Sequence, residues 1–321
     1  MNKNHKNTII YLAAMVVALL LGACSDDMFE EGGQQHSNDR IQLSGDIDQL
    51  AVTRVNDNGF CNGDVMGVYI VDYDGGTPGT LKASGNRGDN VRHTFDEPNY
   101  KWNSAYDLYW KDKHTHIDVY GYYPFADPES VDDYQFEVKR DQSKPSENGE
   151  MGGYEASDFL WGKVADVAPT TSVIRLPMKH RMANARVTLV EGSGFAAGEW
   201  AGTEKTVLAP NLIRKASINL ADGTVTANGS VEATATMPSR SGNEWRAIVV
   251  PQTVKAGVTL FSITIGGVPY KFAKNEAFTY MPGKMSNFSI RVDKKAGSGQ
   301  YQLTLISESI TPWENDLVSH D

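Results

Sequence analysis

The sequence predicts an all-β protein made of two antiparallel β-sandwiches. The first observation is a series of short apolar segments with alternating polarity, separated at short intervals by turn residues. The second is composition, because the 321 residues include 30 Gly, 13 Pro and 10% aromatic residues, as in chains of many strands and turns. The third is that no stretch keeps a 3.6-residue apolar period over helical length.

In the first half, residues 65–71 are apolar on both parities, which predicts a strand buried on both faces. Residues 117–123 alternate in polarity and predict a second strand, and residues 159–164 predict a third. The segments between these strands are rich in Gly, Pro, Asn, Asp and Ser and predict turns. They span residues 74–79, 84–90 and 141–153.

A second series of strands begins after residue 171. Ala183, Ala185, Val187 and Leu189 share one parity, which predicts one buried face. Asn228-Gly229 separates two alternating segments, 224–227 and 231–233, and predicts a two-residue hairpin. Further strands are expected at 245–251, 258–265, 270–272, 288–292 and 301–306. We therefore predict an N-terminal sandwich at 41–170 and a C-terminal sandwich at 171–321.

The first residues predict export. The uncharged, mostly apolar segment 9–23 is too short to span a bilayer and fits a secretory signal. It ends in Leu21-Gly22-Ala23-Cys24, which resembles a bacterial lipobox. We expect residues 1–23 to be removed as a lipoprotein signal peptide and Cys24 to become the lipidated N-terminus. The polar residues 24–40 then form a flexible tether.

Charge restricts the location and the partners. The net charge of −10 argues against nucleic acid as a partner, because phosphates need a basic face. The acidic residues that follow Cys24 resemble the signal that directs lipoproteins to the cell surface in Gram-negative anaerobes. A short acidic run is also a plain solvated tether, so both interpretations stay open. The lipid on Cys24 predicts anchoring in the outer membrane.

No group of residues predicts catalysis, a metal site or a cofactor. Acylation of Cys24 leaves Cys61 without a partner, and we expect it to be a small buried hydrophobe. His114 and His116 share one strand face but lack further ligands. Residues 72–75 begin like a calcium loop, but the later loop positions carry unsuitable residues, so a hairpin tip is the better interpretation. No hydrolase, P-loop or zinc-protease motif occurs.

Seven aromatic residues in the first half allow two interpretations. They either form a sugar-binding platform or fill the core and rim of a sandwich, and we favour the core. A surface glycan-binding lipoprotein that does not polymerise is therefore the alternative function. A surface hydrolase with a loop carboxylate pair is a weaker alternative. The seven residues are Trp102, Tyr106, Tyr109, Trp110, Tyr120, Tyr122 and Tyr123.

An ordered series of segments resembles the fimbrillin family, the subunits of type V pili and their relatives on Gram-negative anaerobes. No single segment is a strong motif, but together they cover roughly residues 41–313 and both predicted domains. The segments are Val52-Thr53-Arg54, 60–69, Lys101-Trp102, 108–110, 117–124, 178–187, 247–252, 278–284 and Ile310-Thr311-Pro312-Trp313.

The resemblance implies two transthyretin-like sandwiches on a lipidated, surface-directed N-terminus. It implies a structural or adhesive pilus subunit, or an accessory protein, without catalytic activity. The implied partners are other fimbrillin subunits and a host or bacterial surface ligand. It also implies an assembly mechanism in which a protease releases the subunit's own N-terminal strand and a strand from a neighbouring subunit replaces it.

On this chain, residues 41–52 are the candidate leaving strand. Arg54 matches the family's Thr-Arg position and is the first candidate for protease cleavage. Arg40, just before the strand, is the second candidate, and at both positions a surface arginine that nothing cleaves is the open alternative. At the other end, residues 300–310 are either a strand donated to a neighbour or the closing strand of the second sandwich.

Overall fold

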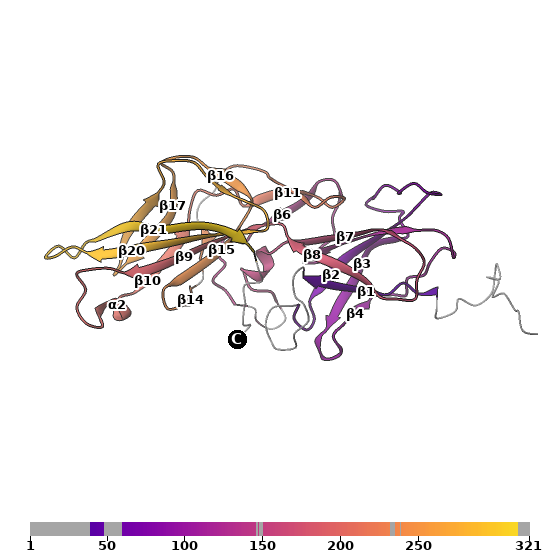
Figure 1. Cartoon of the computed structure of the whole chain (residues 1–321), viewed down its shortest axis with the longest axis horizontal. Helices are drawn as coiled ribbons and strands as arrows, with labels where there is room; N and C mark the ends of the chain where they lie inside the picture. The colour runs from indigo at the N-terminus through magenta and orange to yellow at the C-terminus, as the bar shows by residue number, and fades with distance from the viewer. Residues whose placement is uncertain are drawn as a thin grey trace, which may run out of the picture. The chain divides into compact units, whose positions relative to one another are not determined.

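The computed structural model describes residues 39–47, 60–145, 147, 150–231, 235–237 and 239–313 (Figure 1). Nearly all regular structure in these residues is β. The described helices are the four-residue α2 (Glu199–Gly202) and the 3-10 turns η2 (Glu97–Asn99) and η3 (Glu155–Ser157). The predicted all-β class is confirmed.

The first sheet has seven strands in the order β1-β8-β7-β5-β2-β3-β4. Neighbouring strands are antiparallel except for β1 and β8, which are parallel. The strand β8 lies in this sheet although it follows residue 170, and the division of the chain near that residue stays a prediction. The strands are β1 (Leu43–Ile47), β2 (Val65–Asp72), β3 (Gly88–Asp96), β4 (Lys101–Ser104), β5 (Ile117–Tyr123), β7 (Leu160–Val167) and β8 (Ile174–His180).

The central strand β2 is buried on both faces, as its sequence predicts. Met66, Val68 and Ile70 point into one apolar cluster, which also contains Leu43 of β1. Tyr69 and Val71 point into a second cluster on the other face of the sheet. A strand with an apolar core on each face has no solvated side, which explains the absence of polar alternation in its sequence.

The second cluster joins the first sheet to a three-stranded sheet of order β12-β11-β6. That sheet takes β6 (Tyr134–Glu137) from the first half of the chain and β11 (Lys215–Asn219) and β12 (Thr224–Ala227) from the second. The Trp161 indole donates a 2.8 Å hydrogen bond to the Leu220 carbonyl, and Arg181 stacks over the same indole. The two halves therefore share one apolar cluster.

The C-terminal sandwich packs a five-stranded sheet, β14-β15-β9-β20-β21, against a four-stranded sheet, β13-β10-β17-β18, with the separate pair β16-β19. In the five-stranded sheet, β9 and β20 are parallel. The strands are β9 (Ala183–Glu191), β10 (Lys205–Ala209), β13 (Ala235–Thr236), β14 (Ser239–Ser241), β15 (Glu244–Val249), β16 (Gln252–Val254), β17 (Thr259–Ile265), β18 (Val268–Ala273), β19 (Phe278–Tyr280), β20 (Lys284–Lys294) and β21 (Tyr301–Pro312).

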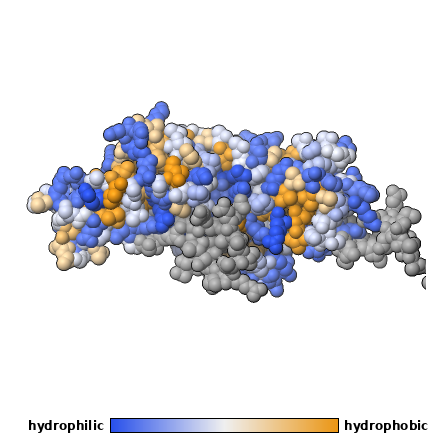
Figure 2. All heavy atoms as spheres, in the orientation of Figure 1, coloured by the Kyte–Doolittle hydropathy of each residue, from blue (hydrophilic) through white to orange (hydrophobic). Residues whose placement is uncertain are grey.

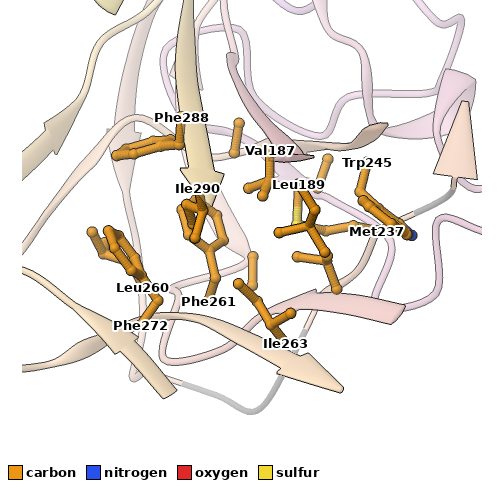
Figure 3. Packing of buried hydrophobic residues seen from close by; sticks show 14 of the residues in the cluster. Val187, Leu189, Met237, Trp245, Leu260, Phe261, Ile263, Phe272, Phe288 and Ile290 are labelled. Carbon is orange, nitrogen blue, oxygen red and sulfur yellow. The ribbon is translucent and has the colours of Figure 1, made fainter. Parts of the chain in front are cut away.

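Alternating side chains of these sheets meet in a third cluster (Figure 3). Phe261 of β17 and Phe288 of β20 pack edge to face with ring centroids 4.9 Å apart. On β9 the side chains of Ala183, Ala185, Val187 and Leu189 are all buried, which confirms the predicted buried parity.

The hairpin predicted across Asn228-Gly229 is wrong. The strand β12 pairs with β11, so the turn lies before β12, where Gly223 has the positive φ of 72° that a tight turn requires. Val231 is 59% exposed and lies outside the described strands. Asp222-Gly223 and Asn228-Gly229 are both good turn signals. Pairing with β11 decides between them, because it places Val225 against the shared cluster.

Trp313 fixes the chain where β21 ends. Its ring stacks on the imidazole of His180 with centroids 4.1 Å apart and planes at 8°. Its backbone N–H donates a 3.0 Å hydrogen bond to the Gly283 carbonyl, and its side chain is buried in the shared cluster. The imidazole in turn lies 2.9 Å from Asp158 Oδ1.

We expect Trp313→Ala to lower the free energy of unfolding by about 3 kcal/mol, because it leaves a cavity in the shared cluster. Tyr106→Ala is the matched control, since Tyr106 is 54% exposed and its loss should cost under about 0.5 kcal/mol. Urea denaturation followed by circular dichroism measures both values. Equal losses for the two variants would contradict the packing described for Trp313.

Candidate functional site

The strand β1 closes the open side of the first sheet. Along one edge it pairs with β8, with Leu43 opposite Ile174 (Figure 1). Just before β1, the Ile41 N–H donates a 2.8 Å hydrogen bond to the Leu108 carbonyl. The strand β1 also contacts β4, which lies at the opposite end of the sheet order. It therefore bridges the two edges of one curved sheet.

Side chains of β1 and the residues before it alternate between core and solvent. Ile41 and Leu43 are 4% and 6% exposed and pack in the first cluster, whereas Gln42 between them is exposed. The Trp102 indole of β4 donates a 3.0 Å hydrogen bond to the Gly45 carbonyl. Removal of β1 would thus expose apolar side chains and leave the edge of β8 without a backbone partner.

This segment is the described part of the predicted leaving strand 41–52. Residues 48–59, which include the first cleavage candidate Arg54, lie outside the described residues, as does the predicted lipidation site Cys24. For this prediction, the structure shows how residues 41–47 pair with β8 and pack in the first cluster.

Arg40, the second cleavage candidate, lies directly before β1. Its guanidinium is 2.7 Å from Asp107 Oδ1, and both side chains are largely exposed, so the ion pair contributes little stability. Its backbone forms an antiparallel bridge with Tyr109. Cleavage after Arg40 therefore requires this backbone pairing to open, although the side chain is accessible.

Cys61 is half-buried rather than fully buried as expected. Its N–H donates a 2.6 Å hydrogen bond to Asp64 Oδ2. Burial raises the pKa of the Cys61 thiol to about 11, and the negative charge of Asp64 adds to the shift. At neutral pH the thiol is protonated, which is unfavourable for nucleophilic catalysis.

The aromatic residues of the first half are mostly core residues. Tyr106 is exposed and Tyr109 is half-buried, whereas the other five are buried, which confirms the favoured core interpretation for these five. The buried five are Trp102, Trp110, Tyr120, Tyr122 and Tyr123. The seven residues therefore do not share one exposed platform.

The polar motifs also have local partners. His116 Nδ1 lies 2.7 Å from Asp166 Oδ1. Asp74 and Thr77 exchange two backbone hydrogen bonds of 2.9 and 3.1 Å, which confirms the predicted hairpin tip. Within the described ranges, no group of three or more His, Cys, Asp or Glu residues could hold a metal ion.

The C-terminal strand β21 pairs with β20 from Tyr301 to Pro312, with one bulge at Ile306. In this structure it therefore closes the five-stranded sheet, which is one of the two alternatives for residues 300–310. Leu305, Ile306 and Ile310 stay partly exposed at 36%, 52% and 41%, and hydrophobic residues reach the surface over this region (Figure 2).

None of the helices in the described part of the chain is long and apolar enough to cross a membrane.

Residues 53–313 match the family model described as fimbrillin-like, so the chain belongs to the fimbrillin-like family. The predicted resemblance is confirmed. A candidate cell adhesion protein from Bacteroides uniformis superposes with a TM-score of 0.61 at 17% identity, over 87% of this chain and 100% of the other. Another from Bacteroides ovatus gives 0.60 at 14% identity, over 88% and 99%. At such low identity, these two superpositions show a common fold and nothing more. No curated protein matches the chain.

We expect Leu43→Ala to lower the free energy of opening of β1 by about 2–4 kcal/mol, because it removes a buried side chain from the first cluster. Gln42→Ala, one residue away on the exposed side, should change stability by less than about 0.5 kcal/mol. Hydrogen exchange of the amides of β1 and β8 measures the local effect. Equal protection in the two variants would show that Leu43 does not hold the strand.

In the Cys24→Ser chain, Cys61 is the single remaining cysteine. At pH 8 we expect iodoacetamide to react with the folded chain at least about tenfold more slowly than with the chain in urea, because the raised pKa reduces the thiolate fraction. Mass spectrometry of timed samples measures both rates. Identical rates would contradict the burial of this thiol.

Proposed function

We propose that this chain is a structural and adhesive subunit, or an accessory protein, of a type V pilus. It is exported as a lipoprotein, anchored through Cys24 in the outer membrane and displayed at the cell surface. Its partners are other fimbrillin subunits, together with a host or bacterial surface ligand, and it has no catalytic role. Membership of the fimbrillin-like family supports the fimbrial role.

The observation that supports assembly by strand exchange is the way in which β1 pairs and packs in the first sheet. This five-residue strand pairs with one neighbour, yet its inward side chains complete an apolar cluster. Burial of Ile41 and Leu43 supplies about 2 kcal/mol each before ordering costs, and the partly buried Ile47 supplies less. That amount holds a covalently attached strand and is small enough for a strand of similar composition to replace it.

Covalent attachment explains why a protease is needed. The groove is the space that β1 fills, between β8 and Trp102 of β4. While β1 belongs to the chain, its effective concentration at this groove is about millimolar, so a strand from another subunit competes poorly. Cleavage between β1 and β2 removes this advantage and lets β1 diffuse away. The incoming strand then gains backbone hydrogen bonds to β8 and the apolar contacts of the groove.

The two cleavage candidates give different products. A cut after Arg54 separates β1 and the tether from the rest of the chain, and so empties the groove. A cut after Arg40 removes the lipidated tether but leaves β1 attached to β2. We therefore propose Arg54 as the assembly site, with cleavage at Arg40 releasing the protein from the membrane without opening the groove.

Limited trypsin digestion of the soluble chain lacking residues 1–24 tests this proposal. We expect a discrete cut after Arg54, a new N-terminus at Val55 and then polymers of high mass in a size assay. Arg54→Ala should abolish both the cut and the polymers, whereas Arg40→Ala, the matched control, should leave both unchanged.

Other outcomes would contradict parts of the proposal. A chain cut after Arg54 that stays monomeric would argue against self-assembly and for a tip, an anchor or a required partner subunit. A chain that is not cut in this segment would favour the non-polymerising glycan-binding lipoprotein. Polysaccharide titrations that shift tryptophan fluorescence would then support that alternative.

A further inference from the structure

The residues whose side chains face the first cluster, on β1 and just before it, are not all large. From the N-terminal side they are Ile41, Leu43, Gly45 and Ile47, a pattern of large, large, glycine and large. Gly45 is buried and is not among the residues with positive φ, so its backbone conformation does not require glycine. The reason for glycine at this position is therefore space.

Two side chains occupy that space. A Cβ atom added to Gly45 would lie 3.0 Å from Met66 Sδ and 3.5 Å from Trp102 Cε2. The Met66 distance is shorter than an ordinary van der Waals contact, and Met66 itself is fully buried, so its side chain has little room to retreat. A larger side chain at this position would have to displace Trp102 as well.

Trp102 is held from two sides. Phe60 packs edge to face on its ring at 4.7 Å between centroids, and Phe95 packs on it at 5.2 Å. Its indole N–H also binds the Gly45 carbonyl. Since every strand offers a backbone carbonyl, this hydrogen bond fixes the depth of a strand in the groove, whereas the surface of Met66 and Trp102 limits the size of the side chain at that depth.

The outward side of β1 offers little selectivity. Ser44 and Asp46 are partly exposed, and the Asp46 carboxylate is 3.6 Å from the Arg175 guanidinium, which is 75% exposed. A solvent-exposed pair at this distance contributes little to binding. Recognition of a strand in this groove therefore depends on its inward positions.

We propose that Met66 and Trp102 make the β1 groove selective for an extended segment with glycine at the third inward position and large aliphatic residues at the first, second and fourth. This inference rests on the proposed strand exchange and specifies its partner. A segment with a larger third residue has to shift along β8 by two residues to avoid the clash, and the shift moves its other side chains out of their positions in the cluster.

The chain's own C-terminal strand does not have this pattern. A bulge at Ile306 places Glu308 and Ile310 on the face of Leu303 and Leu305, so the third residue on that face is not small. Without the bulge the alternate positions are Ser307 and Ser309, and a large fourth residue is missing. The groove therefore fits β21 of a second copy less well than a segment with the complete pattern, so we expect this chain alone to polymerise more slowly than a mixture with a subunit that carries the pattern.

The test uses the full chain with Gly45→Val as the receptor, because its own strand no longer fits the groove. Fluorescent peptides with the sequence of residues 40–47 are the probes. We expect the natural peptide to bind this receptor and not the wild-type chain. The Gly45→Val peptide should bind at least tenfold more weakly, and the Ser44→Val peptide, the outward control, within about twofold of the natural one.

Adding Met66→Ala opens space beside the third position, so the receptor's own strand fits better and both peptides should bind more weakly. The ratio between the affinities of the natural and Gly45→Val peptides should then fall to less than about threefold. A peptide with the sequence of residues 301–312 should bind at least tenfold more weakly than the natural peptide. These two results assign the selectivity to the size of the third position and to the pattern around it.

The outcomes separate this inference from the proposed function. If the natural and Gly45→Val peptides bind equally well, strand exchange stands and the glycine selectivity is overturned. If neither peptide binds a folded receptor, strand exchange at this groove fails, and the selectivity fails with it.

A receptor that does not fold calls for a second measurement on the full chain, the melting temperature of Gly45→Ala with and without Met66→Ala. We expect Gly45→Ala to lower the melting temperature by several degrees, and by less than half as much in the Met66→Ala chain. A loss that Met66→Ala leaves unchanged would overturn the role of Met66.

Discussion

The contact between β1 and the two edges of the first sheet is the interaction on which the proposed activity depends. The sheet curves until β8 and β4 face a common gap, and β1 fills it through backbone pairing with β8 and the Trp102 hydrogen bond from β4. The apolar cluster inside the sheet is complete only with Ile41 and Leu43 in place. A five-residue strand thus protects a much larger apolar surface from water.

The strand β1 contributes to one of the three apolar clusters, and the rest of the fold has contacts of its own. The strands β2 and β5 are paired on both sides, and their other faces belong to the cluster shared with the second half of the chain. The C-terminal sandwich has its own cluster, to which β1 contributes no residue. We therefore expect loss of β1 to open one edge of the first sheet and to leave the C-terminal sandwich folded, as the proposed exchange requires.

Local patterns predicted much of this architecture. The doubly apolar sequence of β2 and the alternation along β9 predicted their burial, because these patterns depend only on the period of a strand. The hairpin at Asn228-Gly229 was wrong because a second turn signal nearby competes with it, and tertiary pairing with β11 decides between them. Cys61 is only half-buried, since residue type alone does not determine position.

The site itself was only partly predictable. The apolar alternation near residue 41 and the resemblance to fimbrillins indicated an exchangeable strand, but the sequence contains no signal for its parallel partner β8, which lies far along the chain. The contact of Gly45 with Met66 and Trp102 likewise depends on three separate strands meeting in space. Such contacts follow from the topology of the sheet, and the periodicity of a single sequence does not predict them.

A reversible covalent link between β1 and β8 would test the central claim most directly. Ser44 and Arg175 are opposite one another in the register, and neither is fully buried, so Ser44→Cys with Arg175→Cys, in a chain with Cys24 and Cys61 changed to Ser, allows a disulfide to form. We expect the oxidised, protease-treated chain to stay monomeric and reduction to start polymerisation. Polymerisation at the same rate with the disulfide intact would show that β1 does not have to leave.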